Sequence, residues 1–330
     1  MNRKLVILVF VFVAVAAALL IRKTISKTPD LTTYEDLAVF FPAGSSEADV
    51  REIVLRVGDN ANATARIVRQ GEEWILPEMY DALADEHQVR ELIRMARELR
   101  GEFRAEDKAL LADFGLVEGP ESKGFRMIGT SGQTLLDIQV GKGDGRSAFV
   151  RRPGEDRVYV VQGNILFQTG LNRDSLDRSR WMNRNLTVLP QDSAQEIILV
   201  GPDGTVTLTA FTPEQAEGAN ATVPMLDGKN WRADLDTWTE EQSMTAAKFI
   251  ESALALMHVD EAVDPARKAE LGLEEPEYLV RVRTWDRTVE IAGTKSGEEF
   301  FVEILGKPRV YRVSGSVFGR VFPDKDSCGH

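Results

Sequence analysis

Phe114-Gly115-Leu116 opens a stretch that ends at Val158-Tyr159-Val160, and the chain contains a similar stretch a second time. The second copy begins at Leu271-Gly272-Leu273 and ends at Val310-Tyr311-Arg312-Val313. Motifs that recur in the same order along one chain indicate a repeated structural unit. The sequence therefore predicts two related modules in tandem.

The spacing between landmarks supports this duplication. Trp74 precedes Gly115 by 41 residues, and Trp231 precedes Gly272 by the same 41 residues. A later glycine and tyrosine are also separated by 18 residues in both copies: Gly141 with Tyr159, and Gly293 with Tyr311.

Each module shows the same succession of local patterns, which are a β-hairpin, then helices, then an antiparallel meander. The hairpins and meanders alternate apolar and polar residues between glycine-containing turns, and the helices carry apolar residues at helical spacing. The fold class predicted is therefore α+β. In the first module the hairpin is 52–57 with 63–69, the meander is 135–141, 147–151 and 157–161, and the helical face is formed by Val89, Leu92, Ile93, Ala96 and Leu99. In the second module the hairpin is 196–200 with 205–211 and the meander is 279–285, 288–291, 300–304 and 309–313. The helical face of the second module is formed by Ala246, Phe249, Ile250, Ala253 and Met257.

Capping signals mark the ends of the predicted helices. Asp85 with Gln88, and Thr239 with Gln242, have the spacing of an N-terminal capping box. Gly115 and Gly272 are expected to end shorter helices in the left-handed conformation, where glycine is the usual residue.

An apolar run without charge, proline or glycine extends from Leu5 to Ile21. As a helix it would reach about 25 Å, a little less than the roughly 30 Å of a bilayer core. A cleaved signal peptide is the alternative, since Arg3 and Lys4 precede the run. The absence of a polar cleavage region favours an uncleaved transmembrane anchor. The predicted domains are this anchor (1–27), a stalk with the first module (28–192), the second module (193–325) and a tail (326–330).

Composition limits the classes of partner. A formal net charge of −12 disfavours a nucleic-acid surface, which needs clustered basic residues. The single cysteine, Cys328, cannot form an internal disulfide, and its polar surroundings predict a frayed terminus.

With the anchor N-terminal, we expect a single-pass protein of the inner membrane whose bulk is extracytoplasmic.

No catalytic constellation is evident. The three histidines have no metal-binding or catalytic spacing, and the glycines at 141, 143 and 145 predict a hairpin turn more readily than a phosphate loop. Glu72 and Glu73 read as a solvated charge pair. Trp74 and Trp231 could form a sugar-stacking platform, but buried anchors are favoured. The sequence thus predicts no enzyme, and no catalytic, cofactor-binding or metal-binding residue.

Together these motifs make the chain resemble the bacterial family called domain of unknown function 4340. The resemblance rests on Trp74 with its following helix, Phe114-Gly115-Leu116 and Val158-Tyr159-Val160, and on Trp231 and Leu271-Gly272-Leu273 in the second copy. It implies a membrane-tethered, extracytoplasmic protein associated with ABC-type transporters of the gliding-motility auxiliary kind. It implies no catalytic residues.

The function expected is that of an accessory or scaffold protein that binds the permease or ATPase subunits of an ABC-type transporter, held at the membrane through Leu5 to Ile21. One alternative is a module that binds envelope lipid or glycan in an apolar cavity lined by both repeats. The other is a carboxylate-dependent envelope hydrolase, which would need a cleft with two facing acids.

Overall fold

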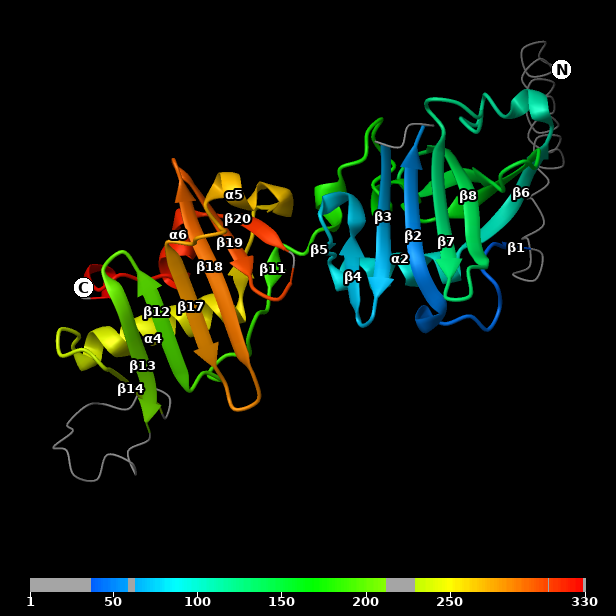
Figure 1. Ribbon diagram of the computed structural model, residues 1–330. Coiled ribbons are helices and arrows are strands. Elements are labelled where there is room, and N and C mark those ends of the chain that lie inside the picture. Colours follow the sequence, from blue (N-terminus) through cyan, green and yellow to red (C-terminus); the bar gives the residue numbers. More distant parts are fainter. Residues whose placement is uncertain (1–36, 59–62, 212–228, 308, 329–330) are drawn as a thin grey trace, which may run out of the picture.

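The computed structural model describes residues 37–58, 63–211, 229–307 and 309–328 (Figure 1). The predicted anchor, Leu5 to Ile21, lies outside these residues. Within the described part of the chain, no helix is both long enough and apolar enough to cross a membrane.

Ten of the described strands form one antiparallel sheet, in the order β1-β6-β10-β9-β8-β7-β2-β3-β4-β5. Residues of β2 alternate between the faces of the sheet, so that Ile53, Leu55 and Val57 are buried while Arg56 is exposed. The strands are β1 (Ala38–Val39), β2 (Val50–Val57), β3 (Thr64–Gln70), β4 (Glu73–Leu76), β5 (Ala82–Leu83), β6 (Arg100–Glu106), β7 (Lys123–Gly129), β8 (Thr134–Gly143), β9 (Ser147–Arg151) and β10 (Arg157–Gln162).

One long helix, α2 (Glu86–Glu98), belongs to this half of the molecule. The Asp85 side chain accepts a hydrogen bond from the Gln88 backbone N–H at 3.1 Å, as predicted. The other helical segments are single turns: η2 (Glu47–Asp49), η4 (Pro77–Met79), η5 (Lys108–Leu110), α3 (Ile165–Gln168) and η6 (Arg178–Trp181).

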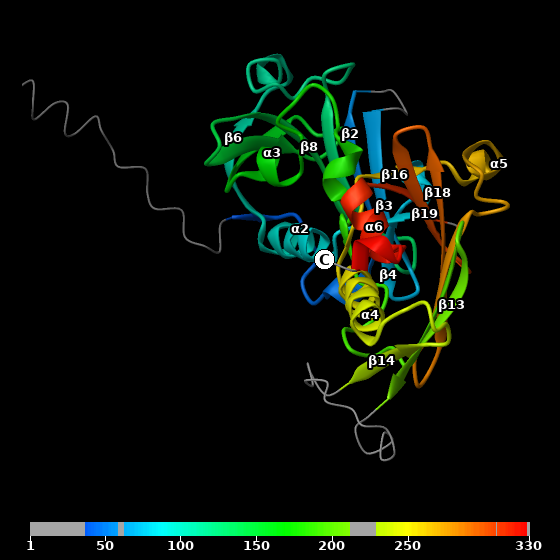
Figure 2. The same cartoon turned by 90° about the vertical axis from the view of Figure 1, so that its left-hand side faces the viewer.

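The second half is built on an eight-stranded antiparallel sheet of described residues, in the order β14-β13-β12-β17-β18-β19-β20-β16. The helices α4 and α6 lie together against one face of it (Figure 2). The elements are β12 (Glu196–Gly201), β13 (Gly204–Phe211), β14 (Asn230–Ala233), α4 (Glu240–Ala255), β16 (Glu261–Val263), η8 (Pro265–Arg267), α5 (Lys268–Leu271), β17 (Tyr278–Arg283), β18 (Thr288–Ser296), β19 (Glu299–Ile304), β20 (Val310–Val313), α6 (Gly315–Val321) and η9 (Asp326–Cys328).

The strand orders of the two sheets correspond when one is read backwards. In the first sheet β10-β9-β8-β7-β2-β3-β4 are consecutive, and in the second β20-β19-β18-β17-β12-β13-β14 are consecutive. The strands β4 and β14 carry Trp74 and Trp231, each 4% exposed, so both tryptophans are buried anchors and neither forms a platform.

The fold class predicted from the sequence is wrong. Of the described residues, 41% lie in strands and 24% in helices, so the protein is mainly β-sheet and not an α+β assembly of helical modules. Before Gly115 the expected helix is the three-residue turn η5, and before Gly272 it is the turn η8 followed directly by the four-residue helix α5. Segments so short gain few hydrogen bonds for the cost of nucleating a helix.

The glycines that end these turns do have the expected left-handed backbone, with φ of +70° at Gly115 and +76° at Gly272. Gly141 has a different role. Strand β8 passes close to the preceding turn, and the Lys142 N–H donates to the Phe114 carbonyl oxygen at 2.8 Å. A Cβ on Gly141 would lie 2.2 Å from that oxygen, so only glycine fits.

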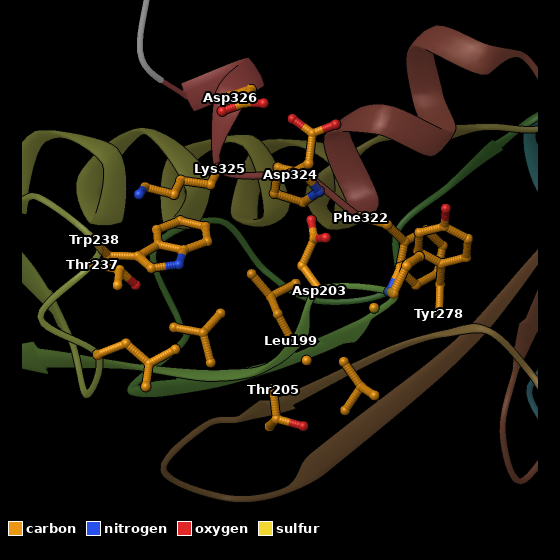
Figure 3. A pocket seen from close by; sticks show the side chains of 17 residues that line it. Leu199, Asp203, Thr205, Thr237, Trp238, Tyr278, Phe322, Asp324, Lys325 and Asp326 are labelled. Atoms are coloured by element: carbon orange, nitrogen blue, oxygen red, sulfur yellow. The ribbon is translucent and has the colours of Figure 1, made fainter.

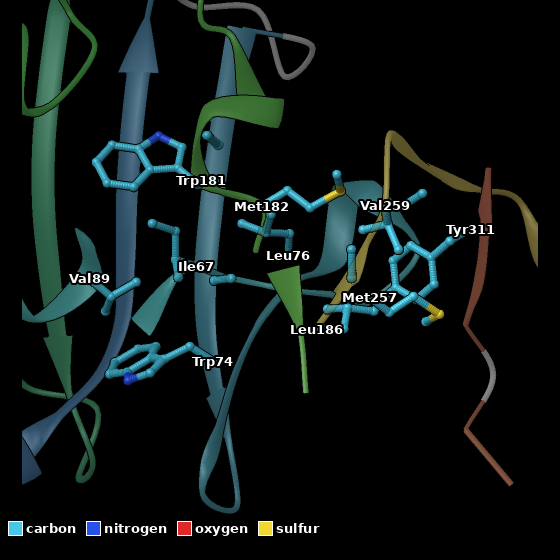
Figure 4. Close-up of a cluster of buried hydrophobic side chains, with 14 of the residues drawn as sticks. Ile67, Trp74, Leu76, Val89, Trp181, Met182, Leu186, Met257, Val259 and Tyr311 are labelled. Atoms are coloured by element: carbon cyan, nitrogen blue, oxygen red, sulfur yellow. The ribbon is translucent and has the colours of Figure 1, made fainter. Parts of the chain in front are cut away.

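A third, two-stranded sheet joins the halves. β11 (Asn185–Leu186) precedes the second half in sequence and pairs with β15 (Met257–His258), which follows α4. Around this pairing, side chains that are at most 3% exposed form an apolar junction (Figure 4): Met182, Leu186, Met257, Val259 and Tyr311. The apolar core is continuous from one half to the other through this junction.

An ion-pair cluster also crosses between the halves. Glu73, in β4, accepts hydrogen bonds from Lys307 Nζ at 2.7 Å and Arg309 Nη2 at 2.9 Å. The Glu73 side chain is 40% exposed, so it is partly solvated as expected from the sequence, but it is also paired with two cations. Its two partners lie more than 230 residues away in the sequence, and no local pattern could reveal them.

Cys328 does not lie in a frayed terminus. Its side chain is 2% exposed and belongs to the apolar core. The Lys325 carbonyl oxygen accepts a hydrogen bond from Gln242 Nε2, which holds this segment beside α4.

Candidate functional site

The residues considered for chemistry in the sequence are not brought together by the fold. His258 Nδ1 lies 3.0 Å from Asn185 Oδ1 in the junction, whereas His87 lies in the first turn of α2. In the segment 141–146, residues 141–143 end β8 and residues 144–146 form the hairpin turn that leads into β9. Its Asp144 carboxylate accepts hydrogen bonds from the backbone N–H groups of Arg146 and Ser147. Over the described ranges, no group of three or more potential metal ligands is found.

A pocket of about 320 Å³ lies at the end of the eight-stranded sheet (Figure 3). Tyr278 of β17 and three segments that are far apart in the sequence line it. The three segments are the β12–β13 hairpin, the loop 235–238 that leads into α4, and residues 322–326 after α6. Its volume is at the lower end of the range for ligand-binding pockets.

The walls of the pocket are apolar and largely aromatic. Leu199 and Phe322 are 6% and 7% exposed, and Trp238 is partly buried against the core. The ring centroids of Tyr278 and Phe322 are 5.7 Å apart, in a tilted arrangement. Phe318 contacts both rings from behind, at 5.2 Å from Tyr278 and 4.7 Å from Phe322. The walls are thus held by the core beneath them.

Charged side chains occupy the mouth. Asp203, Asp324 and Asp326 line it with a single cation, Lys325, which leaves an excess of two negative charges. No ion pair within 4.0 Å between described residues includes any of these three carboxylates. Figure 3 shows Lys325 extending over Trp238 and away from Asp203.

Local structure determines where two of the carboxylates lie. Pro202 and Asp203 are the two turn residues between the paired Gly201 and Gly204, and the positive φ of Gly204 allows this tight connection. Asp324 Oδ1 accepts a hydrogen bond from the Ser327 N–H at 2.7 Å, which begins the turn η9.

The sequence interpretation missed this pocket. It predicted a hairpin of 196–200 with 205–211 and a tail at 326–330, and neither pattern indicated a pocket. The pattern within each segment could not predict the pocket, because the pocket forms only when α6 and η9 place residues 322–326 beside the β12–β13 hairpin.

A second hollow, of about 890 Å³, lies on the first half between the turn that ends at Gly115 and the helix α3. It is the larger of the two, and its wall residues Val117 and Phe167 are 53% and 54% exposed. Because these apolar residues stand open to solvent, this surface is less enclosed than the pocket at Asp203.

Comparison with known proteins gives one match. The family model described as Domain of unknown function (DUF4340) matches residues 74–276, which is more than half of the chain. The match covers Asp203 and Trp238 but ends before Tyr278 and Phe322. The chain matches no curated protein and no solved structure.

Proposed function

The chain belongs to the family Domain of unknown function (DUF4340), and we propose that it is an accessory or scaffold protein of an ABC-type transporter complex that acts by binding. In this proposal it stands at the extracytoplasmic face of the inner membrane and contacts the permease or ATPase subunits. The membrane location rests on the sequence from Leu5 to Ile21 alone.

The observation that supports a scaffold is the buried connection between two large sheets. The junction buries Leu186, Met257 and Tyr311, and Glu73 adds a bond to Lys307 and Arg309 across the same boundary. Interfaces between domains of one chain are ordinarily more polar and permit relative motion. A buried apolar junction instead keeps the two halves in one arrangement, as a protein that positions partners requires.

The ends of this body lie far apart. The described chain begins at β1 on the outer side of the first half, whereas the pocket at Asp203 lies at the opposite end of the second (Figure 1). A protein held near β1 would present the pocket to partners at a distance.

Strand edges offer further binding surfaces. Among the described strands, β14 and β16 each have a neighbour on one side only. Unpaired backbone groups on an edge strand can pair with an extended segment of another protein.

A module that binds envelope lipid or glycan is the second candidate, and the aromatic walls of the pocket favour it. However, Leu199, Trp238 and Phe322 all belong to the second half, so the pocket is not lined by both halves as that hypothesis expected.

The proposal is tested by capturing the full-length chain, tagged and at its native level, from crosslinked membranes in mild detergent. Mass spectrometry should identify an ABC-type permease and ATPase that are missing from an untagged preparation. Recovery of the chain alone, after crosslinking that captures a known membrane complex in the same sample, would refute the transporter association. Recovery of lipid or glycan fragments in place of subunits would favour the second candidate.

A further inference from the structure

The pocket at Asp203 combines an apolar interior with a negatively charged mouth, and this combination selects for the chemistry of its ligand. We propose that it binds a lysine side chain of a partner polypeptide, with an apolar residue beside that lysine. The inference concerns a ligand site on the second half and does not depend on association with a transporter.

The interior suits the aliphatic part of a lysine. Four methylene groups would lie along the partly exposed ring of Trp238, with Leu199 and Val206, each 6% exposed, beneath them. Lysine commonly buries its stem in this way while its ammonium group stays near polar partners. A volume of about 320 Å³ accommodates one long side chain and little more.

The mouth suits the ammonium group. Figure 3 shows the Asp203 side chain rising from the hairpin between Trp238 and Phe322, toward the segment that carries Asp324. Neither carboxylate is paired with a cation in the described structure. A charge-assisted hydrogen bond from an ammonium group would therefore gain energy without first breaking an existing ion pair.

The aromatic wall adds to the attraction for a cation. The Tyr278 ring already attracts one cation, since Lys295 Nζ lies 4.9 Å from its centroid. Lys295 does not line the pocket. Cations are attracted to aromatic faces through the ring quadrupole.

Two features favour a polypeptide over a free amine. Leu235 lines the pocket and is 42% exposed, so an apolar neighbour of the bound lysine could cover it. The mouth also carries an excess of two negative charges, more than one ammonium group neutralises, and this suits a segment with a second basic residue.

The test measures binding of fluorescein-labelled pentapeptides to the full chain by fluorescence anisotropy. One peptide has lysine, leucine and lysine at its centre. Its control has norleucine in place of both lysines, which keeps an aliphatic stem and removes the charge. The lysine peptide should bind at least about tenfold more tightly, and its affinity should fall as salt is added.

Two matched variants locate the site. Asp203→Asn should weaken binding of the lysine peptide about tenfold, because it removes a charged partner and keeps the turn. Asp156→Asn makes the same charge change at a turn of the first half, outside the pocket, and should leave the affinity within about twofold. Circular dichroism checks that both variants are folded.

Several outcomes would overturn the inference. Equal affinity for the norleucine peptide would show that charge is not recognised. An equal effect of the two variants would show that the charge acts at long range and not in the pocket. Competition by 1,5-diaminopentane at the same concentration as unlabelled peptide would assign the site to free amines.

Discussion

At the scale of single residues, Glu251 in α4 is a carboxylate whose environment opposes its charge. Burial raises the pKa of Glu251, and the Ala194 N–H and nearby Lys229 offset this only in part. Its unfolded-state pKa is near 4.5. Because the pKa of Glu251 is higher in the folded state than in the unfolded state, ionisation of Glu251 lowers the stability of the protein as pH rises through the folded-state pKa. Well below pH 4.5 the carboxyl group is protonated in both states, and this loss of stability is absent.

Glu251→Gln should therefore stabilise the protein relative to wild type more at pH 7 than at pH 4. The amide oxygen can still accept from the Ala194 N–H, which is bonded to Oε1 at 3.1 Å. Allowing for solvent screening, the difference should be up to about 1 kcal/mol in the free energy of urea unfolding. Glu241→Gln, on the exposed first turn of α4, is the control. If the effects of the two substitutions on the free energy of unfolding varied with pH in the same way, burial of Glu251 would not be the cause.

Cys328 provides a second prediction at this scale. Burial raises the pKa of its thiol, with Ser327 opposing the shift, and the residue is 2% exposed. A buried thiol is a poor nucleophile because it is rarely deprotonated and seldom meets a reagent. Native protein should react with a disulfide reagent at least about tenfold more slowly than protein in concentrated urea. Equal rates would show that the C-terminal segment is frayed, as the sequence had suggested.

At the scale of elements, the sequence predicted the parts whose signals are local. The meander strands, the Asp85 and Thr239 caps and the burial of Trp74 and Trp231 each follow from alternation, spacing or residue type within one segment. Strand β6 was missed because Arg100–Glu106 is mostly charged and polar. It becomes a strand because β10 and β1 pair with it on both sides.

The same limit explains the candidate site. Asp203, Trp238 and Phe322 lie in three different connections between elements, and none has a partner nearby in sequence. Only the placement of α6 and η9 against α4 brings them together, and that placement depends on tertiary packing. A turn and a tail were therefore the most that those segments could indicate by themselves.

Glycine substitutions test the packing of elements directly. Gly141→Ala should destabilise the protein by about 1 to 3 kcal/mol, because its Cβ would overlap the Phe114 carbonyl oxygen and push β8 from the turn before it. Gly319→Ala is the matched control, since a Cβ there meets nothing within 4 Å in α6. It should stabilise by about 0.5 to 1 kcal/mol. Urea unfolding measures both, and similar effects would contradict the close approach at Gly141.

At the scale of the whole molecule, the arrangement of the halves depends on a junction in which apolar and charged contacts have different roles. Leu186, Met257 and Tyr311 exclude water and hold the halves together. The Arg309 side chain is 8% exposed, and its Nε and Nη1 atoms have no hydrogen-bond partner in the described structure. Glu73 is therefore the acceptor that compensates a buried charge.

Removing the Glu73 carboxylate should destabilise the protein more than removing the Arg309 cation. Glu73→Gln leaves the Arg309 guanidinium buried without a carboxylate, and we expect a loss of about 1 to 3 kcal/mol at pH 7. Arg309→Met removes the buried charge and keeps much of the volume, so its effect should be smaller. Glu270→Gln, which disrupts the exposed pair with Arg267, should change stability little.

The dependence on pH distinguishes this ion pair from a simple packing effect. Burial by itself raises the pKa of Glu73, but hydrogen bonds from Lys307 and Arg309 outweigh it and hold the pKa below its ordinary value of 4.5. The stabilisation is therefore complete above pH 4.5 and is lost as pH falls through the lower folded-state value. The gap in unfolding free energy between wild type and Glu73→Gln should close over that range. A gap that stayed constant down to acid pH would mean that the loss in Glu73→Gln does not come from the ionised carboxylate, and the proposed role of this ion pair between the halves would be wrong.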